Sequence, residues 1–555
     1  MRHGKHRLFL APLLSLATAC VGGGTATTPP APAFDEAAYR AHIQRLSSDE
    51  FEGRAPRTDG ERRTVEYIEQ QFRAAGLEPG VAGSYRQEVP LVEITTHADP
   101  AMELRGPAGR LSLRYGDEMV VWTRRPVPES RLRDAEVVFA GYGIVAPEYD
   151  WNDYSGLDVR GKIVLVLVND PGYATQDAAL FTGNAMTYYG RWTYKFEEAV
   201  RQGAAGLLVI HETKPAAYPW EVVRNGAAKP QFDLRIEDAA SRRLAIEGWL
   251  THEAAARLLA LAGQDYGTLK QAAAKRGFRA PALGLTGSVG VRNDVAYGVS
   301  YNVVGRVRGQ ERPDEHFVYT AHWDHLGTTS GADAGADRIF NGAADNATGV
   351  SALIEIGRAF ALARPRPQRS LLFVAVTLEE SGLLGSEYFA EHPPVPVAKM
   401  VGGLNMDNLS PIGPARDLTV LGYDASELQD YLARAAARQG RVLAREPTPE
   451  KGLYYRSDHF NLAKRGVPML YPKSGVDSVA QGPEFGRAWL DDYVANRYHK
   501  PSDEYDPGWD VSGTLQDLAV YHEVGLALAN GSDWPNWRPG NEFRAIRDAS
   551  RAGVR

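Results

Sequence analysis

The sequence of 555 residues contains a single cysteine, so an internal disulfide bond is excluded. It also lacks a cluster of basic residues interleaved with aromatics, and its formal net charge is only −7, which argues against nucleic-acid binding. No long internal repeat is present, and the apolar run near the N-terminus is too short to span a bilayer as a stable helix. The length exceeds that of one ordinary core, so we expect two or more domains.

The N-terminal segment has the three parts of an export signal. The basic "MRHGKHR" precedes the short apolar "LFLAPLLSLATA", and Cys20 follows directly, which predicts a signal peptide over residues 1–19. The small residues before Cys20 resemble a bacterial lipoprotein signal, and a plain secretory signal with an incidental cysteine is the alternative. Residues 20–33 are rich in Gly, Thr and Pro and predict a flexible tether. We therefore expect an exported protein, held in the bacterial cell envelope through a lipidated Cys20 or secreted.

Hydrophobic periodicity divides the rest of the chain into an interrupted main domain and an insertion. Apolar residues at three- and four-residue steps predict helices in "FDEAAYRAHIQRLSS" and "GERRTVEYIEQQFRAAGLEPG", the second of which ends at Gly76. Residues 131–285 alternate short strands and helices and predict a small α/β module. A second α/β pattern over 291–530 contains apolar strands without polar alternation, which predicts a mostly parallel central sheet flanked by helices. Residues 35–130 and 291–530 are assigned to this main domain.

Polar residues follow several of the predicted strands, at the edge where ligands bind in open α/β sheets. Each could have a local role, for example as a helix cap or in a turn. Together, two histidines and three carboxylates without cysteine suit zinc or a similar divalent ion, and five ligands serve two ions if one carboxylate is shared. A further carboxylate, Glu379, is left over and fits a general base. Five segments each supply one of these ligands; their polar residues are His322, Asp324 and His325 in the first, Asp345 in the second, Glu379 and Glu380 in the third, Asp407 in the fourth and His499 in the fifth.

Five motifs resemble a known family in content and in order. They are "HWD", "GAADNATG", "LEESGLLGS", "NMD" and "YHKPSDE". The sequence resembles the di-zinc exopeptidases of the bacterial leucyl aminopeptidase, aminopeptidase Y and glutamate carboxypeptidase group over roughly 35–130 and 291–530. The module at 131–285 resembles the protease-associated domain that many members carry.

The resemblance implies two Zn²⁺ ions per chain and a role for each motif residue. Asp345 would bridge the ions, Asp407 would join Glu380 on one of them, and His499 would join His322 on the other. Asp324 would stand behind His322 and orient it. Glu379 would move the proton of the catalytic water. Tyr498 either donates to the oxyanion or is only a core or wall residue, whereas Asp458 and His459 are not expected to be ligands.

The implied activity is that of an exported zinc exopeptidase, most simply an aminopeptidase that acts on peptide substrates. A carboxypeptidase of the glutamate carboxypeptidase type or a dipeptidase is the alternative. A carboxypeptidase needs arginines that hold a substrate carboxylate, and Arg456 and Arg497 are candidates by their place in the sequence. A related single-zinc fold that cyclises N-terminal glutamine would not need all five ligands. A receptor-like binding protein is a further class, but it predicts eroded ligands, whereas this sequence retains all five.

Overall fold

The computed structural model describes Met1 and residues 34–329 and 336–553. The predicted signal peptide and tether, and with them Cys20, lie outside the described residues apart from Met1. Within the described part of the chain, no helix combines the length and the hydrophobicity needed to cross a membrane.

The main domain is built around a mostly parallel sheet, as the apolar runs predict. Strand β14 lies between β17 and β18, and all three are parallel; β21 extends the parallel part beyond β18. Antiparallel neighbours flank this part, β13 beside β17 on one side and β19 beside β21 on the other, with β20 outermost next to β19. The strands are β13 (Leu285–Val307), β14 (Arg312–His322), β17 (Arg369–Val376), β18 (Met400–Asn405), β19 (Asp417–Leu421), β20 (Val442–Arg445) and β21 (Met469–Ser474).

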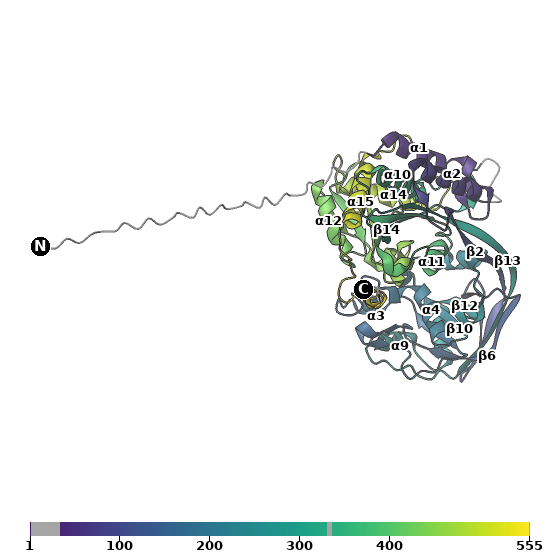
Figure 1. Cartoon of the computed structure of the whole chain (residues 1–555). Helices are drawn as coiled ribbons and strands as arrows, with labels where there is room; N and C mark the ends of the chain where they lie inside the picture. The colour runs from purple at the N-terminus through teal and green to yellow at the C-terminus, as the bar shows by residue number, and fades with distance from the viewer. Residues whose placement is uncertain (2–33, 330–335, 554–555) are drawn as a thin grey trace.

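Helices cover both faces of this sheet, which explains why every residue of β17 is buried. One face packs against α1, α2, α10, α12 and α15, which lie together in the upper part of Figure 1, and the other packs against α11 and α13. Gly76 ends α2 with a φ of +85°, as expected of a helix-stopping glycine. The helices are α1 (Glu36–Leu46), α2 (Asp59–Ala75), α10 (Thr348–Leu362), α11 (Leu384–Glu391), α12 (Leu428–Arg438), α13 (His459–Lys464), α14 (Pro483–Asn496) and α15 (Ser512–Asn530).

The inserted module has its own α/β core, which lies in the lower part of Figure 1. Strands β6, β9, β10 and β12 are parallel neighbours, and β5 pairs antiparallel with β12. The elements are β5 (Met119–Trp122), β6 (Glu129–Phe139), β9 (Ile163–Leu167), α4 (Trp192–Arg201), β10 (Gly206–His211), β12 (Ile246–Thr251), α8 (His252–Leu261) and α9 (Tyr266–Ala273).

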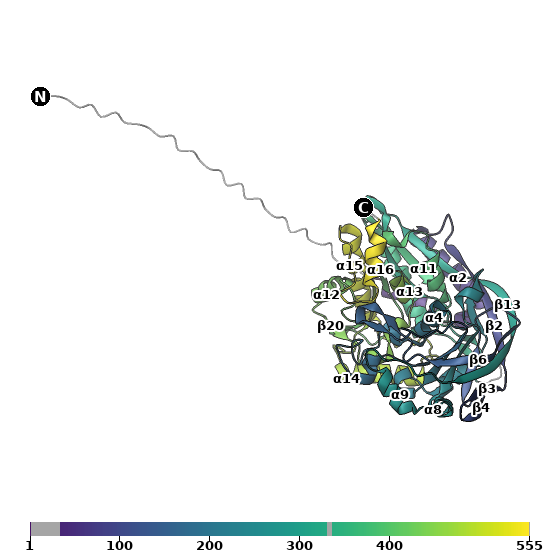
Figure 2. The same ribbon diagram turned by 90° about the horizontal axis from the view of Figure 1, so that it is seen from below.

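The boundary of the module differs from the expected one on both sides. Strand β13 is continuous for 23 residues: it starts beside β6 and ends beside β17, so it belongs to the module and the main domain alike. Strands β3 (Ala101–Gly106) and β4 (Gly109–Arg114) lie beside α8 of the module (Figure 2). Residues 101–122 were assigned to the main domain from the sequence, but their partners are strands and helices of the module.

Candidate metal centre

The fold brings the five predicted ligands to one place. His322 is the last residue of β14, Glu380 lies four residues beyond β17, and Asp407 lies two residues beyond β18. Because these strands are parallel neighbours, their carboxyl ends meet at the same edge of the sheet. Asp345 enters this edge from the turn that precedes α10, and His499 enters from the segment that follows α14.

The first group of candidate ligands consists of His322, Asp345 and Asp407. His322 Nε2 lies 3.2 Å from Asp345 Oδ1 and 3.5 Å from Asp407 Oδ1. The other oxygen of Asp407 accepts hydrogen bonds from the Ser457 and Tyr471 hydroxyl groups, both at 2.7 Å. These two bonds fix the Asp407 carboxylate so that Oδ1 faces His322.

The second group forms on the opposite oxygen of Asp345. His499 Nε2 lies 3.3 Å from Asp345 Oδ2 and 3.0 Å from Glu380 Oε2. The two oxygens of Asp345 therefore face different histidines, which is the arrangement that a bridging carboxylate requires.

The pairing of the ligands within these groups corrects the expected one. From the resemblance, Asp407 was placed with Glu380 and His499 with His322, whereas the structure places Asp407 beside His322 and Glu380 beside His499. His322 and Asp407 face Asp345 Oδ1 and each other, whereas Glu380 lies on the side of Asp345 Oδ2, beside His499. Neither Asp458 nor His459 belongs to a group of candidate metal ligands in the described chain.

The distances and the charge of the site fit divalent metal ions. Two ligands of one tetrahedral zinc ion, each bound at about 2.0–2.2 Å, are separated by roughly 3.4 Å, and the four distances above are 3.0–3.5 Å. Burial alone would lower the pKa of His499, but Asp345 and Glu380 raise it to about 10. Such a raised pKa indicates surplus negative charge, which bound cations would neutralise.

The two adjacent glutamates differ in their partners and in their proton affinity. Burial acts on both, but His325 and His499 offset it for Glu380 and lower its pKa to about 2. Burial together with Glu380 and Asp407 raises the pKa of Glu379 well above its ordinary value. Among the described residues the Glu379 carboxylate has no hydrogen-bond partner, so it remains available to take up a proton.

Asp324 orients the site differently from the expected way. Its carboxylate is fully buried and accepts hydrogen bonds from the backbone N–H groups of Glu379, at 3.1 Å, and Glu380, at 3.4 Å. The backbone carbonyl of Asp324, rather than its carboxylate, is within hydrogen-bond distance of His322 Nδ1, at 3.1 Å. The carboxylate oxygen is 3.9 Å from that nitrogen. Asp324 therefore holds the two glutamates and the histidine in one arrangement.

His325 is a candidate ligand to which the motifs assigned no role. Its Nδ1 lies 2.7 Å from Glu380 Oε1, and it groups with Asp345 and Glu380 as a possible metal-binding set. The other ring nitrogen, Nε2, is buried without a hydrogen-bond partner in the described chain. The motif "HWDH" already contained this residue, and its place directly after β14 was the available signal.

Two further residues hold the ligand-bearing loops, and neither was identified from the sequence. Arg54 is 1% exposed and donates hydrogen bonds to the backbone carbonyls of Trp323, Asn341 and Gly342, which joins the loop after β14 to the turn before Asp345. Asp503, within "YHKPSDE", accepts the backbone N–H of Asp345 at 3.1 Å. A buried arginine in a loop rich in Gly, Pro and Asp gives no periodic signal that would distinguish it from an exposed one.

Tyr498 lies at the wall of the site. Its ring stacks on that of His499, with 3.9 Å between the centroids, and 43% of the residue is exposed. The exposure excludes a core role, and the role of its hydroxyl group in catalysis stays a prediction.

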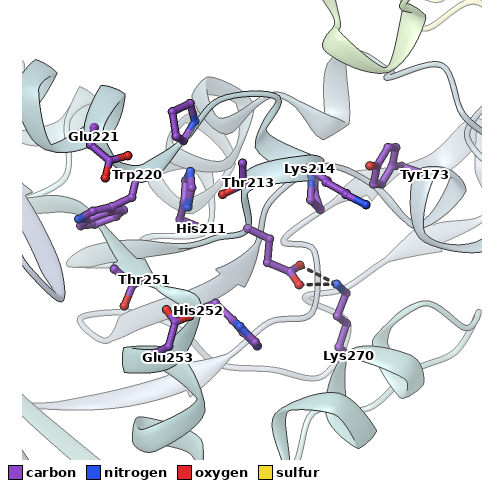
Figure 3. Close-up of a pocket in the computed structure, with 13 residues that line it drawn as sticks. Tyr173, His211, Thr213, Lys214, Trp220, Glu221, Thr251, His252, Glu253 and Lys270 are labelled. Carbon is purple, nitrogen blue, oxygen red and sulfur yellow. Dashed lines mark hydrogen bonds and ion pairs between the residues drawn. The ribbon is translucent and has the colours of Figure 1, made fainter.

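A separate cavity of about 740 Å³ lies in the inserted module (Figure 3). Its lining includes Trp220, His252 and an ion pair between Lys270 and Glu212, with Nζ–O distances of 2.6 and 2.7 Å. None of the candidate metal ligands lines this cavity. The metal centre and the cavity are therefore two distinct features.

The fold and the site together define an α/β domain with a candidate two-metal centre. Residues 302–522 match the model of Peptidase family M28. The match confirms the resemblance drawn from the five motifs and places this part of the chain among the zinc metallopeptidases.

Curated relatives also match only part of this chain. A probable zinc metalloprotease of Leptosphaeria maculans is 28% identical over 212 residues, which are 37% of this chain and 47% of that protein. The mouse protein Aminopeptidase NAALADL1 is 32% identical over 107 residues, which are 19% of this chain and 13% of that protein. The chain thus spans less than half the length of these relatives.

Solved structures resemble the chain over most of its length. An aminopeptidase from Aneurinibacillus sp. strain AM-1 is 19% identical with a TM-score of 0.47, and 90% of this chain and 94% of that chain are covered. The Bacillus subtilis zinc aminopeptidase BSAP is 17% identical with a TM-score of 0.40, and 92% and 99% are covered.

Proposed function

We propose that the protein is a zinc-dependent exopeptidase with two ions per chain, and that it removes N-terminal residues from peptides. The observation that carries this proposal is the division of Asp345 between two histidines, each with its own second carboxylate. His322 and Asp407 would hold one ion, His499 and Glu380 the other, and Asp345 both. The family match of residues 302–522 supports the same class of reaction.

The ions, when bound, would polarise the scissile carbonyl and lower the pKa of the attacking water. Glu379 takes a proton from that water as the new C–O bond forms, and then gives it to the amine nitrogen as the C–N bond breaks. Its raised proton affinity favours the first of these steps. Asp324 keeps Glu379 beside the ligands through the backbone of the same loop.

Aminopeptidase and carboxypeptidase activities require different free ends of the peptide substrate. We propose to test them with two substrates. Leucyl-p-nitroanilide has a free amine and no carboxylate, and N-acetyl-leucyl-leucine has a blocked amine and a free carboxylate. Each is assayed before and after removal of metal by chelation and after zinc is restored. Zinc-dependent cleavage of the anilide supports an aminopeptidase, and cleavage of the N-blocked peptide alone moves the assignment to a carboxypeptidase. Activity that survives complete metal removal contradicts the zinc mechanism.

The export predicted from residues 1–19, with or without lipidation of Cys20, is proposed for the same protein. Globomycin-sensitive processing and membrane fractionation would support the lipidated form, whereas a Cys20→Ser variant that fractionates like the parent protein would contradict it.

A further inference from the structure

The cavity of the inserted module lies at the edge of a sheet where ligands usually bind. Its lining comes mainly from segments that follow three neighbouring parallel strands. Tyr173 lies beyond β9, residues between 211 and 221 lie at and beyond the end of β10, and residues 251–253 lie at and beyond the end of β12. In open α/β sheets, ligands bind outside the carboxyl ends of such strands. The volume of about 740 Å³ is also within the range of small-molecule sites, about 300–1,000 Å³.

The aromatic wall of this cavity is held in place by contacts within the module. His211 is 4% exposed, and its Nε2 atom lies 3.0 Å from the carbonyl oxygen of Tyr218. The indole N–H of Trp220 donates to the carbonyl oxygen of Gly116 at 2.9 Å, and its ring packs edge-on against that of His211, with centroids 5.6 Å apart. A ligand therefore meets a preformed surface, which reduces the cost of ordering side chains on binding.

The charged groups around the cavity are separated by sign. Glu221 and Glu253 lie on the same side as Trp220, whereas Lys214 lies on the opposite side (Figure 3). Burial lowers the pKa of His211, and both glutamates are near enough to oppose this shift. Within residues 34–329 and 336–553, neither glutamate forms an ion pair, and Lys214 has no carboxylate partner. Charges of both signs are therefore available to a ligand.

These features specify a ligand with two charged ends and an apolar body. The ion pair of Lys270 and Glu212 balances its own charge, so the two free glutamates and Lys214 face the ends of the ligand. A positive group fits beside the glutamates, where the ring of Trp220 also favours a cation, and a negative group fits beside Lys214. Because the two signs lie on opposite sides of the cavity, the two ends of the ligand must be separated, as the termini of a peptide are.

We propose that this cavity binds a short peptide with both termini free, its ammonium group beside Glu221 and Glu253 and its carboxylate group beside Lys214. Apolar side chains of the peptide would pack on Trp220 and Tyr173, which border the cavity. The inference goes beyond the proposed function, because none of the candidate metal ligands lines the cavity. The module would thus hold peptides at a second site, apart from the metal centre.

The test observes Trp220 itself by fluorine NMR. Zinc-loaded full-length protein carries Glu379→Gln, so that peptides are not consumed, and its 10 tryptophans are replaced by 5-fluorotryptophan. The resonance that is absent from the Trp220→Phe protein belongs to Trp220. The protein is titrated with trileucine, N-acetyl-trileucine, trileucine amide, free leucine and the disaccharide chitobiose.

We expect the Trp220 resonance to shift saturably with trileucine. Each peptide with one blocked end should bind about twofold to fivefold more weakly, because an ion pair between exposed groups contributes little. Free leucine should bind more weakly than trileucine, because one amino acid cannot reach both sides of the cavity.

Variants of the exposed charged residues assign the two ends of the peptide separately. Glu221→Gln combined with Glu253→Gln should bind free and N-acetylated trileucine alike and still prefer the acid to the amide. Lys214→Gln should show the opposite pattern, which a general loss of folding cannot produce. Lys229→Gln is the control, because Lys229 is an exposed lysine of the same module that does not line the cavity, and it should retain both preferences.

A Trp220 resonance that stays in place even at millimolar trileucine would overturn the inference. Equal affinities for trileucine and both blocked forms would do so as well, since the charged ends would then play no part. A saturable shift with chitobiose but not with peptides would overturn it and assign the cavity to a sugar. Failure of the proposed function is distinguishable, because the resonance of Trp220 reports on the cavity and not on catalysis at the metal centre.

Discussion

Replacement of Asp503 by Asn should weaken the metal centre although Asp503 is not itself a candidate ligand. The residue is 1% exposed, and its two carboxylate oxygens accept the backbone N–H groups of Ala344, at 3.0 Å, and Asp345, at 3.1 Å. The Tyr493 hydroxyl donates to the same carboxylate at 3.1 Å. Asp503 thereby fixes the turn from which Asp345 reaches both histidines.

The size of the effect follows from these hydrogen bonds. Asparagine keeps one acceptor oxygen but places an NH₂ group against the other donor. One charge-assisted hydrogen bond is lost, at about 1.5–3 kcal/mol, and a buried N–H is left unsatisfied, at about 1–3 kcal/mol. We therefore expect Asp503→Asn to lose about 3–5 kcal/mol of unfolding free energy and to bind zinc about 10–100-fold more weakly, as loss of an outer partner does.

The assay is competition for zinc with a chromophoric chelator, together with urea unfolding of the metal-free protein. Burial raises the pKa of Asp503 to about 6, so measurements at pH 8 keep the carboxylate ionised. Asp506→Asn is the control, because Asp506 is exposed and caps only a local turn through Gly508. Zinc affinity and a urea midpoint equal to those of the wild type in Asp503→Asn would refute this reasoning.

Two further predictions concern stability away from the ligands themselves. In Gly349→Ala, the new Cβ would lie 2.3 Å from Asn346 Oδ1 and 2.5 Å from the Met406 carbonyl oxygen. We therefore expect the free energy of unfolding, measured in urea, to fall by about 1–3 kcal/mol. The control is Gly226→Ala, in which it should not fall because the space around Gly226 is open. Burial lowers the pKa of His316 to about 4, whereas in the unfolded chain it is about 6.5. Acid therefore favours the unfolded state: the contribution of neutral His316 to the free energy of unfolding is full above pH 6.5 and is lost as the pH falls toward 4, by about 2 kcal/mol at pH 5. His316→Gln should show a correspondingly smaller loss between pH 7.5 and 5, and an equal loss would contradict the assignment.

The positions of the candidate ligands could be predicted from the sequence because they follow short-range rules. An apolar run such as "SLLFVAV" marks a buried parallel strand, and the residue after it lies at the ligand-binding edge. His322, Glu380 and Asp407 were found in this way, and the structure brings them together with Asp345 and His499.

The pairing of these ligands could not be predicted from the same rules. It depends on which strands are neighbours and on which oxygen of Asp345 faces which histidine, and neither has a signature in the local sequence. The position of Asp324 shows the same limit: the family resemblance placed its carboxylate behind His322, but the carboxylate turns to the backbone of Glu379 instead.

The boundaries of the inserted module could not be predicted from the local sequence either. Residues 101–122 resemble any other strand-rich segment, and contacts with residues far along the chain, such as the pairing of β5 with β12, assign them to the module.

The division of roles between Glu379 and Glu380 is the central claim, and the paired variants Glu379→Gln and Glu380→Gln test it most directly. Zinc content per chain and kcat are measured for both, with Glu391→Gln, which removes a partner of two surface arginines, as the control. The account predicts that Glu379→Gln retains two zinc ions and loses about 10²–10⁴-fold in kcat, whereas Glu380→Gln loses zinc as well. Equal zinc content and equal residual activity in the two variants would contradict it.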